Sequence, residues 1–297
     1  MLIVSHIRKH PYIASGLLAA LALISIMFAQ GTWHLLFNSD NPNARYALYG
    51  GLVGFAATAL GALPALMLRT IPQTLEDAML GFAAGMMLAA ASFSLLLPGL
   101  EAGFEFTSSR IYGALLVVFG MFLGVMLMLG LDEFVPHQHD TTGTFGVGAE
   151  RYNKAWLFVF AIALHNLPEG MAIGVSFAKG DLTVGIPLTT AIALQDIPEG
   201  LAVALTLRAV GFSAFYAVSV AIISGVFEPL GALLGVGLAG GYLLSYPIGL
   251  GLAAGAMIFV VSHEVIPETH RNGHQTLATI GLMVGFALMM VLDTTLG

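Results

Sequence analysis

The chain has 297 residues, of which 58% are hydrophobic and 9% are charged, and its formal net charge at pH 7 is −7. This composition excludes a soluble globular fold, and the lack of cysteine excludes disulfides and a thiolate metal site. No basic stripe is present that would bind nucleic acid.

Apolar runs of about 20 residues, the length with which an α-helix crosses a bilayer, recur along the chain. We therefore expect an all-α, polytopic membrane helix bundle that forms one transmembrane domain over 1–297 and has the lipid bilayer as a partner. The predicted spans are 12–30, 46–68, 75–99, 110–130, 155–178, 183–207, 213–236, 246–264 and 275–295.

The first run, 12–30, follows Arg8 and Lys9 and could imitate a signal peptide. It lacks a good small-residue cleavage site, so we expect a retained, extra N-terminal helix. Three core helices then occupy 46–130.

A longer connection over 131–154 is expected to be a cytoplasmic loop. It carries His137 and His139, which either collect emerging metal ions or are incidental loop histidines.

Two near copies of one sequence lie thirty residues apart, AIALHNLPEG at 161–170 and AIALQDIPEG at 191–200. They fall on the neighbouring spans of a helix pair over 155–207, and these spans run in opposite directions. Two copies on antiparallel helices indicate inverted-repeat character, an arrangement that recurs in secondary transporters with a site near the midplane.

Each copy carries three side chains with nitrogen or oxygen donors, spaced to share one face of a helix. These are His165, Asn166 and Glu169, then Gln195, Asp196 and Glu199. Pro168 and Pro198 follow in the two motifs and are expected to kink the helices. Ionisable residues at membrane depth are costly, so the pattern predicts a metal site. The alternative is that the polar groups only join helices through hydrogen bonds.

Glu228 adds a fourth carboxylate in the next span, and the last three helices occupy 213–295. Two divalent cations would neutralise four such charges. Mixed nitrogen and oxygen ligands suit zinc-like ions better than magnesium or calcium.

The sequence His-Asn-x-Pro-Glu-Gly at 165–170, followed by a second Pro-Glu-Gly at 198–200, resembles the signature of the ZIP (Zrt/Irt-like) divalent-metal transporters. The resemblance covers the last eight spans. It implies import of Zn²⁺, or of Cd²⁺, Fe²⁺, Mn²⁺ or Co²⁺, into the cytoplasm by alternating access, with an elevator-like movement of a helix bundle.

Gln195-Asp196 in the second motif resembles a bacterial branch with a binuclear centre. The resemblance implies one metal ion bound by His165, Glu169, Gln195, Asp196 and Glu199. It implies a second bound by Asn166, Glu169, Asp196, Glu199 and Glu228.

Further polar residues follow the expected path. Met87, Ser94 and Glu101 recur every seven residues on one face of their span, so Met87 is either a soft ligand or packing. Ser94, Glu101 and Asp293 lie towards the outside, as an entrance path or as solvated helix ends.

His263, Glu264 and Glu268 lie where their span reaches the cytoplasm, and we expect an exit relay there. The residues 263–267 do not form the His-Glu-x-x-His motif of zinc peptidases, because Pro267 stands at the position of the last histidine.

Seven of the ten Lys and Arg residues fall on one side of the predicted spans. This bias places the N-terminus in the cytoplasm and the C-terminus outside. The resemblance to the bacterial branch implies a bacterial inner membrane. Glycine-rich helix faces are compatible with a homodimer.

We expect a transporter, not an enzyme. The alternative is a membrane-embedded di-metal enzyme. Di-iron bundles, however, use a Glu-x-x-His motif with ligands spread over four helices. Here the motif is His-x-x-x-Glu, and the ligands lie on adjacent helices. A metal sensor would need a signalling domain.

Overall fold

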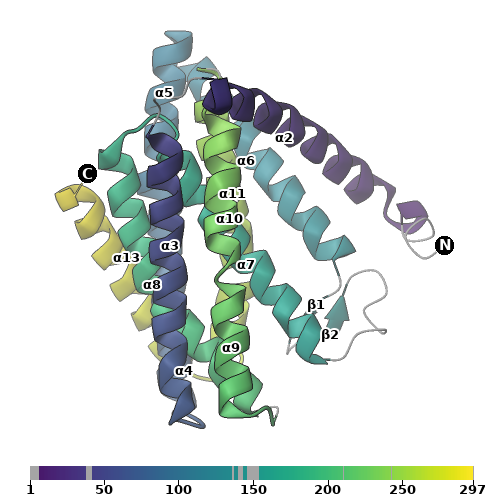
Figure 1. Ribbon diagram of the computed structural model, residues 1–297, viewed down its shortest axis with the longest axis vertical. Helices are drawn as coiled ribbons and strands as arrows, with labels where there is room; N and C mark the ends of the chain where they lie inside the picture. Colours follow the sequence, from purple (N-terminus) through teal and green to yellow (C-terminus); the bar gives the residue numbers. More distant parts are fainter. Residues whose placement is uncertain are drawn as a thin grey trace.

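The structure is a computed structural model. Its backbone is described for residues 7–37, 42–135, 137–139, 143–145, 154–209, 211–241 and 243–296. The side chains of the same residues are described except those of 31, 32, 34–37, 137–139, 143–145 and 154–164. Within these limits the chain is an all-α bundle of long helices with one small hairpin, which confirms the predicted fold class (Figure 1).

Five helices form one group, which we call the site bundle. They are α3 (Asn43–Ala62) with its 3₁₀ continuation η1 (Leu63–Leu66), α7 (Lys154–Ser176), α8 (Leu182–Ala209), α9 (Ala214–Ser224) and α10 (Phe227–Ala239). Its most extensive contacts join α3 to α8 and α7 to α10.

The remaining core helices form a second group, the framework bundle. They are α4 (Gln73–Ala89), the π-helix η2 (Ala90–Leu96), α5 (Leu97–Thr107), α6 (Arg110–Phe134), α11 (Ser245–Val260), the π-helix η4 (Val261–Val265), α12 (Ile266–Thr269) and α13 (Gln275–Leu296). Here α4 packs on α13 and α6 packs on α11. Of the first three core helices, α4 and α6 thus pair with α13 and α11, and α3 also contacts α10. These contacts are of the kind expected for an inverted repeat.

The extra N-terminal helix, α2 (Pro11–Phe37), contacts both α6 and α10 and thus touches both bundles. The connection predicted as a loop contains an antiparallel hairpin of β1 (His137–His139) and β2 (Gly143–Phe145), in which His137 pairs with Phe145. The hairpin was not expected from the sequence.

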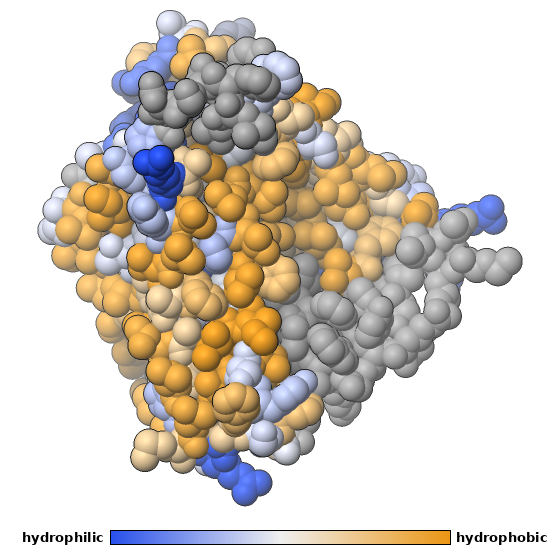
Figure 2. Space-filling model, in the orientation of Figure 1, coloured by the Kyte–Doolittle hydropathy of each residue, from blue (hydrophilic) through white to orange (hydrophobic). Residues whose placement is uncertain are grey.

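Eight of the described helical segments are long and apolar enough to cross a membrane. Helix α7 accounts for the remaining predicted run. Apolar side chains cover much of the face in Figure 2, with hydrophilic ones gathered at its ends. The chain is therefore an integral membrane protein.

Three helix pairs approach through reciprocal Gly-x-x-x-Gly sequences. The pairs are Gly81 and Gly85 with Gly281 and Gly285, Gly120 and Gly124 with Gly251 and Gly255, and Gly170 and Gly174 with Gly231 and Gly235. A Cβ at any of these positions except Gly231 would overlap, or nearly overlap, a carbonyl oxygen of the facing helix; at Gly231 the carbonyl oxygen would lie 2.6 Å away. Among the described glycines, every such approach to another helix's backbone lies within one bundle. These glycines pack internally, so they give no support to a homodimer.

Three spans are less regular than the sequence predicts. The π-helices η2 and η4 are each followed by a proline, Pro98 or Pro267, which cannot donate a backbone hydrogen bond. The wider π turns of η2 change the helical phase, so Met87 and Glu101 do not keep a uniform seven-residue register. The predicted span 213–236 is broken between α9 and α10, next to Gly225.

Candidate metal centre

Three carboxylates from the repeated motifs meet in the site bundle. Glu169 of α7 and Asp196 and Glu199 of α8 each offer an oxygen, and these oxygens all lie within 4.8 Å of one another. Glu169 and Asp196 are buried. Helical spacing places each group on one face, and the antiparallel contact between α7 and α8 brings the two faces together.

Glu228 joins this cluster from the first turn of α10 and is fully buried. Thr58 of α3 donates a hydrogen bond of 2.6 Å to Glu228 Oε1. A Cβ at Gly54 would overlap Glu228 Oε2 and lie 3.2 Å from Asp196 Oδ2. Glycine at position 54 therefore leaves the space in which the carboxylates of Glu228 and Asp196 converge.

The two amide side chains of the motifs are also buried. Gln195 Nε2 donates to Glu169 Oε1 at 2.5 Å, which orients both side chains. Asn166 is 3% exposed on the same helix as Glu169.

Several buried oxygens of the cluster accept no hydrogen bond from the described residues. They are Glu169 Oε2, Gln195 Oε1, Asp196 Oδ2 and Glu228 Oε2. None of the four carboxylates forms an ion pair with a Lys or Arg in the described part of the chain. Buried acceptors without donors or counter-charge are strongly unfavourable, and a bound cation satisfies them.

His165 lies beside the framework bundle. Its Nε2 is 3.4 Å from Oε2 of Glu264, a buried residue of η4. The sequence suggests that Glu264 belongs to the cytoplasmic end of its span, but the structure brings its carboxylate to a histidine of the central motif. The contact joins the two bundles next to the carboxylate cluster.

The other expected exit residues lie apart from this contact. His263 Nε2 is 3.6 Å from Asp132 Oδ2, and its ring stacks on Phe259 with the centroids 5.0 Å apart. Glu268 pairs with Arg271 at 3.0 Å. The side chains of His137 and His139 lie outside the described residues.

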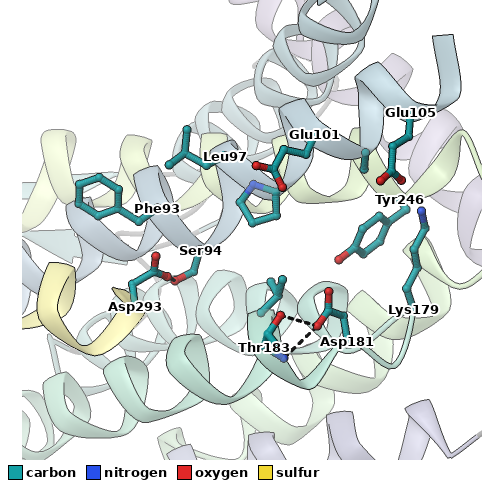
Figure 3. A pocket seen from close by; sticks show the side chains of 13 residues that line it. Phe93, Ser94, Leu97, Glu101, Glu105, Lys179, Asp181, Thr183, Tyr246 and Asp293 are labelled. Carbon is teal, nitrogen blue, oxygen red and sulfur yellow. Dashed lines mark hydrogen bonds between the residues drawn. The ribbon is translucent and has the colours of Figure 1, made fainter. Parts of the chain in front are cut away.

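Met87 is buried on α4 within the apolar core, where Ile192 of α8 also packs. Ser94 donates a hydrogen bond of 2.6 Å to Asp293 Oδ1. Ser94, Asp293 and Glu101 all line one cavity of about 370 Å³ (Figure 3). The structure thus brings three of the expected entrance residues together.

Sequence reasoning missed Thr58, Gly54 and Asp132. A threonine one turn after a glycine, in an otherwise apolar run, was the available signal for the first two. Asp132 is an acidic residue near a span end, which sequence alone does not distinguish from a solvated one.

An all-α membrane bundle in which two copies of one motif enclose buried carboxylates defines a polytopic membrane protein with an internal cation site. The family model described as ZIP Zinc transporter matches residues 137–293. The zinc transporter ZIPB of Bordetella bronchiseptica is 61% identical over 290 residues, covering 98% of this chain and 94% of that protein. The chain therefore belongs to the ZIP zinc-transporter family.

More distant relatives align with most of the chain as well. The zinc transporter GufA of Myxococcus xanthus is 42% identical over 250 residues, with 84% of this chain and 98% of that protein covered. The human zinc transporter ZIP11 is 30% identical, with 84% of this chain and 97% of that protein covered.

Proposed function

We propose that this protein carries divalent transition-metal ions, foremost Zn²⁺, across a bacterial inner membrane into the cytoplasm. The observation that carries the proposal is the set of buried oxygens at Glu169, Gln195, Asp196 and Glu228, which have neither donors nor counter-charge within the described structure. A divalent cation exchanges its hydration water for these oxygens and neutralises the carboxylates. The names of the relatives support zinc as the first ion to test.

The donor atoms of the cluster suffice for two ions that share carboxylates. The first would be bound by His165, Glu169, Gln195, Asp196 and Glu199, and the second by Asn166, Glu169, Asp196, Glu199 and Glu228. The unpartnered oxygens support both sets, because Gln195 Oε1 belongs only to the first and Glu228 Oε2 only to the second. Glu169 and Asp196 each offer an unpartnered oxygen to both ions.

The path to the site begins at the cavity of Ser94, Glu101 and Asp293, which faces outside when the N-terminus is cytoplasmic. Met87 lies between this cavity and the motifs along α4 and would offer a thioether. Release towards the cytoplasm would pass Glu264 and His263.

Glu268, His137 and His139 follow Glu264 and His263 in the direction of the cytoplasm and would complete this exit path. Glu264 supports such a handover because its carboxylate already lies 3.4 Å from His165.

The packing of the two bundles supports alternating access. Among the described residues, every glycine whose Cβ would meet a carbonyl oxygen of a facing helix has its partner in the same bundle, whereas Gly249 at the interface would meet the side chain of Ala239. The bundles meet where α4 contacts α8 and where α7 contacts α11. Such an interface permits the site bundle to slide against the framework bundle while carrying the ions. The alternative of a membrane di-metal enzyme finds no support in the relatives, whose names are those of transporters.

Uptake of Zn²⁺ into sealed proteoliposomes that contain a zinc-responsive dye tests the proposal. Wild-type protein is expected to give saturable uptake, which His165→Ala and Glu199→Ala reduce at least tenfold. Glu76→Gln, which removes one negative charge from a side chain that lies outside the proposed path and is bonded to the exposed Gln73, serves as the matched control and should retain most uptake. Folded wild-type protein that binds zinc but moves none would contradict transport.

A further inference from the structure

One basic side chain projects into the cavity at the outer end of the predicted path, which we call the outer vestibule. The residues that line it include four carboxylates and a single ammonium group (Figure 3). They are Glu101, Glu105, Asp181 and Asp293, with Lys179. The positive charge of the lysine repels the cations that the four carboxylates attract, which suggests that it has a role in the vestibule.

The backbone that carries Lys179 is fixed. Lys179 lies in the turn between α7 and α8, where Asn43 of α3 donates a hydrogen bond of 2.8 Å to the carbonyl of Ala178. Gly180 adopts a φ of 73°, which closes the turn in the left-handed region. The lysine side chain therefore starts from a defined point at the rim of the vestibule.

The ammonium of Lys179 lies over the ring of Tyr246, with Nζ 4.5 Å from the ring centroid. This is a cation–π contact. Lys179 forms no ion pair of 4.0 Å or less with the described carboxylates. Tyr246 is only 5% exposed, and its hydroxyl points into the vestibule (Figure 3). The ring thus holds the positive charge inside the vestibule without neutralising any one carboxylate.

The carboxylates remain available to a cation. Ser94 occupies one oxygen of Asp293, and Thr183 donates twice to Oδ1 of Asp181, at 2.9 and 2.7 Å. The second oxygen of each is left for another partner. Glu101 and Glu105 are exposed at the mouth of the vestibule.

We propose that Lys179, held on Tyr246, is a specificity-determining residue that sets how strongly the outer vestibule captures a hydrated divalent cation. The inference rests on the proposed transport function. Four carboxylates without a nearby positive charge would capture a divalent ion at the outer end of the path more strongly. A fixed ammonium lowers that attraction, and it does so twice as much for a divalent ion as for a monovalent one.

Lys179→Met removes the charge and keeps an apolar side chain of similar length. We expect KM for Zn²⁺ uptake to fall about threefold to tenfold, with kcat changed less than twofold, because one unit charge near a divalent ion in water-like surroundings has an effect of this size. Raising the ionic strength to about 0.5 M should shrink the difference below about twofold. Lys179→Arg, which keeps the charge and stacks on an aromatic ring, should behave as wild type.

Arg45→Met is the matched control, since it removes the same charge from an exposed position close to the same turn but outside the vestibule. It should leave KM unchanged.

Removing the ring of Tyr246 should change KM in the opposite direction. Tyr246→Leu frees the ammonium to pair with a carboxylate and should raise KM, whereas Tyr246→Phe keeps the ring and should not. Adding Lys179→Met to Tyr246→Leu should return KM to the value of Lys179→Met alone.

A Lys179→Met protein that transports with unchanged KM at low salt overturns the inference and leaves the transport function standing. A wild-type protein that transports no metal contradicts the function itself.

Discussion

At the scale of single residues, the candidate centre depends on small polar groups that hold the carboxylates in place. Thr58 is such a group, because its hydroxyl is the described partner of Glu228 Oε1. Partners that orient a ligand commonly change metal affinity by tenfold to a hundredfold when removed.

Thr58→Val removes the hydroxyl and keeps the shape of the side chain. We expect the zinc affinity of the purified protein to fall about tenfold, and uptake to fall with it, while the unfolding temperature stays within a few degrees of wild type. Calorimetric zinc titration measures the affinity. Thr58→Ser should restore it, and Thr190→Val, whose hydroxyl bonds the backbone of its own helix on an exposed face, should have no effect. Equal affinities for Thr58→Val and wild type would contradict the role.

Asp77 has a structural role near the N-terminal end of α4. It is 1% exposed and accepts hydrogen bonds from Asn272 at 2.9 Å and, through its other oxygen, from His274 at 2.8 Å. These bonds fix the turn before α13 onto α4. Asp77→Ala should destabilise the fold by about 2 kcal/mol, since hydrogen bonds to charged groups contribute about that much. A thermal unfolding scan in detergent measures the loss.

Glu76→Ala, next in the sequence and bonded only to the exposed Gln73 in the described structure, is the control for Asp77→Ala. Its unfolding temperature should match that of wild type. If both variants unfold at the wild-type temperature, Asp77 does not fix the turn.

At the scale of helices, the reciprocal glycine pairs set how closely the helices pack. In a membrane no hydrophobic force drives helices together, so close backbone approach and dispersion contacts must hold the pairs. The same glycines cannot accept a larger residue without separating the helices.

Gly85→Ala should lower the unfolding temperature by several degrees, because its methyl group would overlap the carbonyl oxygen of Leu282 on α13. Overpacking of this kind costs about 1–3 kcal/mol. Gly99→Ala is the matched control: its methyl group would meet Leu250 Cβ at 3.4 Å, an ordinary contact. Scanning fluorimetry compares the two variants. Equal unfolding temperatures would show that α4 and α13 do not depend on the glycine contact.

At the scale of the whole molecule, two bundles that are each packed internally through close glycine contacts meet along one interface. The chain has no cysteine, so pairs of cysteines can be introduced without interference. Gly249 of α11 and Ala239 of α10 face one another across the interface, with a Cβ at Gly249 lying 3.1 Å from that of Ala239.

A disulfide between Gly249→Cys and Ala239→Cys should stop zinc uptake by preventing the bundles from moving, and reduction should restore it. The Cβ separation lies slightly below the range of about 3.5–4.5 Å found in disulfides, so the two helices must part slightly for the bond to form. A second pair, Gly99→Cys with Leu250→Cys, lies within the framework bundle at 3.4 Å and should leave uptake intact when oxidised. Full uptake by the oxidised Gly249–Ala239 pair would contradict movement between the bundles.

The sequence by itself determined the membrane class, the nine helical runs, the family and the grouping of Glu169, Asp196 and Glu199. Hydrophobic length and, in the two motif helices α7 and α8, helical spacing are local properties that folding leaves unchanged. The metal-binding roles of these residues and the domain boundaries remain predictions.

Only the tertiary structure decided which helices meet and what lies between them. It brought Thr58 and Gly54 to Glu228, His165 to Glu264, and Lys179 to Tyr246. These partners are far apart in the chain, or come together where π turns and a helix break change the direction of a span. Such contacts depend on the packing of whole helices, which the pattern of one sequence does not encode locally.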